Sequence, residues 1–192
     1  ETSAEKRARL AEGLQKAGQT AAVITLPDSL CWLLNIRGAD VPRNPVLHGF
    51  AILHDDARVT LFAEAGKFDE AVKHAMGRQV SLRPVQAFVP ALHTLQGPVR
   101  VDRSSAPLAV SMELTEEGIA VAWGDDPCRL PKACKNPAEI AATREAHLRD
   151  GAAVVEFLCW LDAESPKGGL TEIDVVRGLE GFRRATNALH DI

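Results

Sequence analysis

Residues 21–54, AAVITLPDSLCWLLNIRGADVPRNPVLHGFAILH, contain the order of elements that decides the fold. The run AAVITL (21–26) is continuously apolar and rich in β-branched residues, which is typical of a short strand buried on both faces. The PDS tripeptide (27–29) supplies a turn and an N-cap, so a short helix is expected over LCWLLN (30–35). The sequence therefore predicts a strand, a turn and a helix.

An irregular segment and a hairpin follow this first unit. One Gly and two Pro residues in IRGADVPRNP (36–45) exclude regular structure there. The runs VLHGFAILH (46–54) and RVTLFA (58–63) have the composition of strands, and the HDDA stretch between them (54–57) suits a hairpin turn.

The flanking sequence extends the α/β pattern in both directions. Leu10 and Leu14 share one face of an expected helix over 4–17, which Gly18 ends. Further helices are expected over 66–76, 87–95 and 106–117, and further strands over 80–85, 98–102 and 119–123. Helices alternating with strands in this order predict a three-layer α/β/α domain around a mixed sheet.

The pattern changes after a polar, proline-containing break at 124–139. Asn136 has the position of an N-cap, with Pro137 after it and Glu139 at the third helical position, so a long helix is expected to about Glu164. A second helix is expected after Thr171.

These two expected helices carry more apolar surface than they can bury against each other. The large apolar side chains are Val154, Val155, Phe157, Leu158, Trp160, Leu161, Ile173, Val176, Leu179 and Phe182. Burying each is worth ~1.5–3 kcal/mol, so leaving all of them in water costs tens of kcal/mol. We therefore expect a further segment or a second copy of the chain to cover them, and oligomerisation where nothing else does.

Composition narrows the class of protein. The 192 residues are 46% hydrophobic and 25% charged with a net charge of -4, which is typical of a globular domain. Scattered Lys and Arg argue against nucleic acid and anionic membranes as partners, and no apolar run is long enough to span a bilayer. The first residues, ETSAEKRARL, lack a Met and an apolar core, so we expect an internal, processed or engineered start without a signal peptide.

No metal or catalytic motif emerges from the sequence. The four cysteines, Cys31, Cys128, Cys134 and Cys159, lack C-x-x-C spacing and are expected to be reduced, which weakly favours the cytosol. The six His residues include no HExxH pair, and the acidic pairs at 55–56 and 125–126 fall in expected turns. We therefore predict that this chain holds no metal and no catalytic residue.

Three stretches together resemble one family. They are PDSLCWLLNIRGADVPRNPV (27–46), KNPAEIAATREAHLRDGAAVVEFLCWLD (135–162) and PKGGLTEIDVVRGLEGFRR (166–184). In this order they resemble the three-domain Xaa-Pro aminopeptidases of the pita-bread metallopeptidase superfamily, and the resemblance covers nearly the whole chain.

The resemblance implies a domain assignment and an activity. Residues 1–133 would be the creatinase-like middle domain, and residues 134–192 the linker and first helices of a truncated catalytic domain. The family removes an N-terminal residue that precedes proline, using two divalent metal ions, usually manganese. The family's metal-ligand motifs do not occur in this sequence, so the chain is expected to be inactive alone and to serve oligomerisation and the rim of the active site.

Two residues are candidates for a functional role. Arg37 lies in the irregular loop, where a guanidinium can meet a peptide carbonyl or carboxylate, as rim residues of this domain do in related enzymes, often in a neighbouring subunit. The alternatives are pairing with Asp40 or capping of the preceding helix. Trp32 belongs to a subunit interface or to the core.

The parent protein is thus expected to be a cytoplasmic, homodimeric Xaa-Pro aminopeptidase acting on peptides with proline at the second position. A rival interpretation is a non-catalytic pita-bread homologue that binds proteins. A third is creatinase or prolidase itself, which the NIRG stretch (35–38) fits less well.

Overall fold

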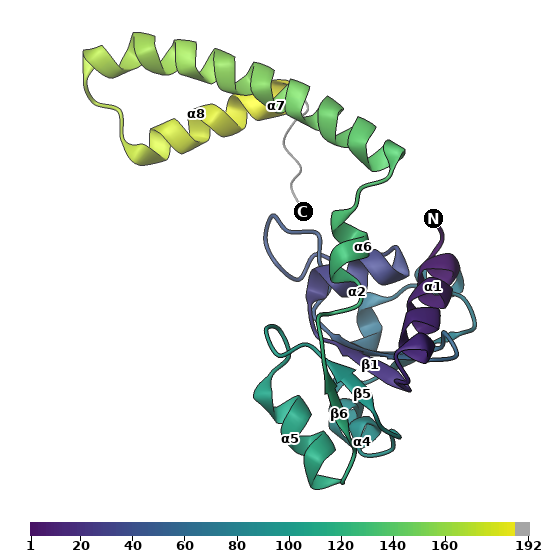
Figure 1. The fold of residues 1–192 in the computed structure, drawn as a ribbon. Coiled ribbons are helices and arrows are strands. Elements are labelled where there is room, and N and C mark those ends of the chain that lie inside the picture. Colours follow the sequence, from purple (N-terminus) through teal and green to yellow (C-terminus); the bar gives the residue numbers. More distant parts are fainter. Residues whose placement is uncertain (187–192) are drawn as a thin grey trace. The chain divides into compact units, whose positions relative to one another are not determined.

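The structure of the protein is a computed structural model that describes residues 1–186, and the chain divides into two compact units after Cys134 (Figure 1). The elements of the first unit are, in order, α1 (Ser3–Lys16), β1 (Ala21–Ile24), α2 (Pro27–Leu34), β2 (Phe50–His54), β3 (Val59–Phe62), the 3-10 turn η1 (Ala65–Lys67), α3 (Glu70–Met76), β4 (Val80–Arg83), η2 (Val85–Ala87), α4 (Phe88–Leu92), β5 (Val99–Val101), α5 (Leu108–Glu116), β6 (Val121–Trp123) and α6 (Arg129–Ala133).

The strands form one sheet in the order β4-β3-β2-β1-β5-β6. Two pairs are antiparallel, β1 with β2 and β2 with β3, and the remaining pairs are parallel. The sheet is therefore mixed, as predicted. The antiparallel pairing places the end of β1, the start of β2 and the end of β3 at the same end of the sheet, because Ile24 pairs with Ala51 and Phe50 with Phe62.

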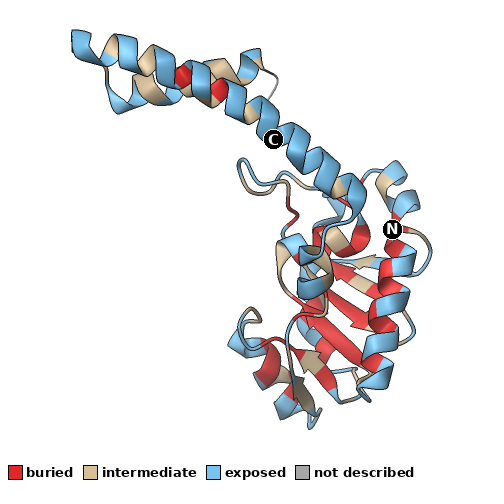
Figure 2. Cartoon of the chain, turned by 45° about the horizontal axis from the view of Figure 1, so that its top comes forward, coloured by how far each residue is buried: buried red, intermediate tan, exposed pale blue. Residues whose placement is uncertain are grey.

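The sheet is covered on both faces, which confirms the three-layer prediction. Ala22 and Ile24 of β1 belong to the core cluster that includes leucines of α1 and α2, whereas Ala21 and Val23 belong to the cluster that includes residues of α4 and α5. This alternation follows from the two-residue period of a strand. All four residues of β1 are buried, and Figure 2 shows the buried strands between exposed helical faces.

Several boundaries differ from the sequence predictions. The helix expected over 66–76 begins only at Glu70, because the Asp69 carboxylate caps it by accepting a hydrogen bond from the Val72 N–H at 2.7 Å. The short helix expected over 30–35 is α2, which begins at Pro27, a residue preorganised for the first helical turn. Ser29 therefore lies inside the helix and is not its cap.

Two further differences concern the loops. The strand expected from Val46 begins at Phe50, because the Val46 N–H donates to the Asn44 oxygen in the preceding loop and the Leu47 N–H donates to the Cys31 sulfur in α2. The break expected over 124–139 contains the short helix α6.

The second unit consists of α7 (Pro137–Glu164), the 3-10 turn η3 (Ser165–Lys167) and α8 (Glu172–Ala185). Both α-helices begin with a reciprocal capping box: Asn136 pairs with Glu139, and Thr171 with Asp174. The long helix and its predicted start are therefore confirmed.

The two long helices pack through a small aromatic cluster. The rings of Phe157, Trp160 and Phe182 have centroids 6.0–6.5 Å apart, and Asp150 forms an ion pair with Arg183 at 2.6 Å. Many apolar side chains stay uncovered, including Leu148, Val155, Leu158, Ile173 and Val176, which are 49–72% exposed. The excess of apolar surface expected from the sequence is thus visible in these helices.

No helix within the described residues, 1–186, is long and apolar enough to cross a membrane. One of the six histidines considered above, His190, lies outside the described residues.

Candidate functional site

The loop that carries Arg37 connects α2 to β2 at the end of the sheet where β1 and β3 terminate. At this position β1 has a parallel neighbour, β5, on one side and an antiparallel neighbour, β2, on the other. Loops beyond the carboxyl ends of the strands of an open α/β sheet are common ligand sites. We call residues 36–48 the Arg37 loop.

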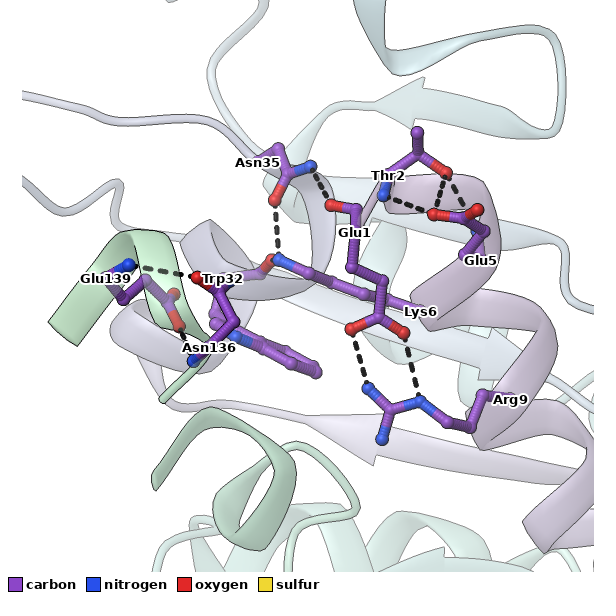
Figure 3. A network of polar contacts seen from close by, with 9 residues as sticks. All are labelled: Glu1, Thr2, Glu5, Lys6, Arg9, Trp32, Asn35, Asn136 and Glu139. Carbon is purple, nitrogen blue, oxygen red and sulfur yellow. Dashed lines mark hydrogen bonds and ion pairs between the residues drawn. The ribbon is translucent and has the colours of Figure 1, made fainter. Parts of the chain in front are cut away.

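The start of the Arg37 loop is fixed by the end of α2. Asn35 adopts a left-handed conformation with φ 55°, and its N–H and that of Ile36 both donate to the Cys31 carbonyl. The buried Lys6 of α1 donates to the Asn35 side-chain oxygen at 2.6 Å and to the Trp32 carbonyl at 2.8 Å (Figure 3). The lysine therefore satisfies the Trp32 carbonyl, one of those that the end of a helix leaves without partners, and holds the side chain of the residue that ends α2.

The end of the Arg37 loop returns to the same helical residue. The Leu47 N–H donates to the Cys31 sulfur at 3.3 Å, and both residues are buried. Burial raises the pKa of the Cys31 thiol, so the sulfur stays protonated and acts as a weak, neutral acceptor. Cys31 thus holds both ends of the loop.

The middle of the loop is held by a close backbone approach. A Cβ on Gly38 would lie 2.7 Å from the Val46 oxygen and 2.9 Å from the Leu47 Cα, so only glycine fits. The Gly38 N–H donates to the Pro45 oxygen at 3.4 Å. The two halves of the loop are therefore packed backbone against backbone.

Asp40 connects the first half of the Arg37 loop to the end of the same loop and to the turn η1. One carboxylate oxygen accepts from the His48 N–H at 2.7 Å, and the other contacts the Lys67 Nζ at 2.8 Å. These two partners hold the pKa of the Asp40 carboxyl below its ordinary value, the Lys67 contact having the larger effect. The carboxylate therefore stays charged over the neutral and mildly acidic range.

Arg37 itself is exposed at the mouth of a small pocket. Its Nη1 donates to the Ile36 carbonyl at 2.8 Å, and the Asp40 carboxylate pairs with Lys67 in place of the Arg37 partner considered from the sequence. The pocket has a volume of about 240 Å³, with Phe68 and Leu47 among its lining residues beside Arg37 and Lys67. Asp40 lines it too, so the pocket combines an apolar wall with the Asp40–Lys67 ion pair and the Arg37 guanidinium, whose donors suit the carbonyl or carboxylate end of a small apolar peptide.

Trp32, the second candidate, lies in α2. Its ring packs against the core cluster on one side and is covered by the Lys6 Nζ at 4.4 Å from the ring centroid and the Arg9 guanidinium at 5.9 Å (Figure 3). The side chain is half-buried within this chain. A role in a subunit interface stays a prediction.

Sequence reasoning missed Lys67, Cys31 and Lys6 as parts of this site. The sequence contains no local signal for Lys67, because it reaches Asp40 only through the antiparallel pairing of β2 with β3. Within residues 1–186, no group of three or more His, Cys, Asp or Glu side chains is placed to hold a metal ion.

Residues 1–139 match the family described as the Creatinase/Prolidase N-terminal domain. The chain belongs to the creatinase/prolidase N-terminal domain family. The resemblance noted in the sequence and the predicted fold class are thereby confirmed.

Curated relatives of this creatinase/prolidase-type chain include Xaa-Pro aminopeptidases. It is 33% identical over 189 residues to a probable Xaa-Pro aminopeptidase P of Laccaria bicolor, covering 93% of this chain and 28% of the relative. It is also 33% identical over 192 residues to Xaa-Pro aminopeptidase 1 of Dictyostelium discoideum, covering 95% and 30%. The chain therefore spans about 30% of the length of these relatives.

Solved structures agree with the family assignment. The X-prolyl aminopeptidase of Caenorhabditis elegans, a cytosolic enzyme with a di-nuclear active site, superposes with a TM-score of 0.86 at 30% identity, covering 96% of this chain and 31% of that one. A Xaa-Pro dipeptidase from Bacillus anthracis superposes with a TM-score of 0.72 at 18% identity, covering 96% and 49%, and supports the fold alone.

Proposed function

We propose that this chain is part of a metal-dependent Xaa-Pro aminopeptidase, which removes an N-terminal residue that precedes proline. The observation that carries the proposal is the combined sequence and structural similarity to the X-prolyl aminopeptidase of C. elegans over 96% of the chain. Residues 1–133 would be the creatinase-like domain, and residues 134–192 the linker and first helices of the catalytic domain.

The metal chemistry falls outside the described residues in this proposal. The family implies two divalent ions, for which manganese is the expected metal, and these ions would activate a water molecule for peptide hydrolysis. Residues 1–186 do not fit such a site, because no three potential ligands come together in them. We therefore assign no catalytic step to these residues and expect the chain alone to be inactive.

The contribution of the described residues is recognition at the rim of the active site. The Arg37 guanidinium is exposed beside an apolar wall, and its planar donors match a peptide carbonyl or carboxylate. In a homodimer, the Arg37 loop of one subunit would serve the active site of the other, with Trp32 near the interface. A cytoplasmic location is proposed by analogy with the cytosolic C. elegans relative.

The test uses the full-length product of the gene that encodes this chain. The purified protein is loaded with manganese and given a tripeptide with proline at the second position, and the same peptide with alanine there is the control. We expect release of the first residue from the proline peptide only. Metal-loaded protein that cleaves neither peptide would overturn the proposal and favour a non-catalytic binding role.

A further inference from the structure

The position of Arg37 is set by the backbone of its loop and not by its own side-chain contacts. The side chain is exposed, and within residues 1–186 its one hydrogen bond is to the carbonyl of the neighbouring Ile36. Such a contact moves with the loop and cannot fix the guanidinium relative to the sheet. Whatever holds residues 36–40 therefore decides where this guanidinium lies.

The first end of this segment is held by α2, as described above, and the other end is held by Asp40. Its carboxylate reaches the returning chain at the His48 N–H and the turn η1 at Lys67, while its own N–H donates to the Val46 oxygen at 3.3 Å. One side chain, three residues after Arg37, thus connects three separate segments. Removing it leaves the segment tied at α2 and by backbone contacts only.

Asp40 also determines the charge of the pocket. Lys67 lines the same pocket as Arg37, and its ammonium is 2.8 Å from the Asp40 carboxylate and 3.8 Å from that of Glu64. The Arg37 guanidinium has no carboxylate partner among the contacts of the described residues. The ion pair therefore leaves Arg37 as the pocket's cation available to a ligand.

We infer that Asp40 is a positioning residue, which places the Arg37 guanidinium for substrate binding and neutralises the competing Lys67. This inference rests on the proposed peptidase function, in which Arg37 binds the substrate. Asp40 also lines the pocket, but its two carboxylate oxygens are engaged by the His48 N–H and the Lys67 ammonium, so we assign its effect on substrate binding to Arg37.

The test is a double-mutant cycle on the full-length, manganese-loaded protein with the X-Pro tripeptide. We expect Arg37→Ala and Asp40→Ala each to raise KM roughly tenfold with kcat changed less than about twofold, and the double variant to resemble Arg37→Ala alone. Asp40→Asn retains an acceptor for the His48 N–H and loses the ion pair, so it should give an intermediate KM. Additive effects of Asp40→Ala and Arg37→Ala would overturn the inference.

The matched control is Asp56→Ala at the opposite end of β2. Asp56 likewise accepts from a backbone N–H and a basic side chain, those of Arg58. This variant should leave KM unchanged.

A second measurement separates this inference from the proposed function. Amide hydrogen exchange over residues 36–47 should be faster in Asp40→Ala than in the wild type or Asp56→Ala, whether or not the protein cleaves peptides. Unchanged exchange in the loop would overturn the positioning role by itself. If the wild-type protein does not cleave the X-Pro tripeptide, the proposed function is overturned instead.

Discussion

The sulfur of Cys31 accepts a hydrogen bond from the Leu47 N–H at 3.3 Å, across a loop whose start is bonded to the Cys31 carbonyl. A residue of α2 thus closes the Arg37 loop with its side chain and its backbone. Because Leu47 is buried, its N–H has no access to water if the sulfur is removed.

Cys31→Ala should therefore destabilise the first unit. The buried N–H left without an acceptor costs about 1–3 kcal/mol in the free energy of unfolding. Urea unfolding measures this change, and amide hydrogen exchange in β1 and β2 shows whether it affects the sheet. The exposed Cys134→Ala is the control and should stay within about 0.5 kcal/mol of the wild type. Equal effects of both substitutions would contradict the role assigned to the sulfur.

Thiol reactivity gives an independent check on the same residue. Cys31 and Cys128 are buried, and burial raises the pKa of both thiols, whereas Cys134 and Cys159 are exposed. Because the thiolate is the reactive form, a raised pKa lowers reactivity at pH 8. Mass spectrometry of the folded chain treated with a maleimide should show rapid labelling at the two exposed cysteines only. Rapid labelling of Cys31 would show that the loop opens readily.

Gly38→Ala should loosen the Arg37 loop. The new methyl would lie 2.7 Å from the Val46 oxygen, which forces the two halves of the loop apart. A loss of about 1–3 kcal/mol in unfolding free energy is expected. Gly13→Ala in α1 is the matched control, because nothing lies within 4 Å of its Cβ, and it should stabilise by about 0.5–1 kcal/mol. A neutral Gly38→Ala would contradict the close packing of the loop.

The Asp40–Lys67 pair predicts a pH dependence with a definite sign. The Asp40 pKa is lowered, so the contact is complete above the ordinary aspartate pKa of about 4 and is lost only as the pH falls through the lowered value. An NMR titration of the His48 amide should therefore have its midpoint below that of an ordinary aspartate. Lys67→Met should move the midpoint upward. An unchanged midpoint would mean that Lys67 does not control this carboxyl.

In the second unit, Gly178→Ala should disrupt the packing of α7 on α8. A Cβ at Gly178 would lie 2.8 Å from the Trp160 ring, which must then leave the aromatic cluster with Phe157 and Phe182. Trp160 fluorescence should shift towards that of an exposed indole. Gly181→Ala lies in the same helix with open space around it, so it should leave the fluorescence unchanged. A shift in both variants would point to a general effect on α8.

The sheet and helices were predictable from sequence because their patterns are local. The continuous apolar run of β1 matches four buried residues that divide between two cores, and the Asn136–Glu139 pair matches the capping box of α7. The exact start of α3 was missed, because the Asp69 cap follows a buried Phe68 that resembles the first apolar residue of the helix.

The candidate site was only half predictable. Arg37 was identified because it follows a helix and precedes two prolines, and these are local features. Its supports depend on tertiary structure: Lys67 arrives through the β2–β3 pairing, and Lys6 through the packing of α1 beside α2. Pairing of Arg37 with Asp40 was one of the alternatives considered, but Asp40 pairs with Lys67, since sequence distance is a poor guide in a loop that folds back on itself.

Both ends of the Arg37 loop bond to one helical residue, Cys31, so the loop is attached to α2 at both ends, and residues 42–44 at its tip are exposed. A substitution at this tip should therefore leave the bonds of Cys31, the close packing at Gly38 and the contacts of Asp40 in place. The surface that the loop presents can thus be altered without disturbing these three supports.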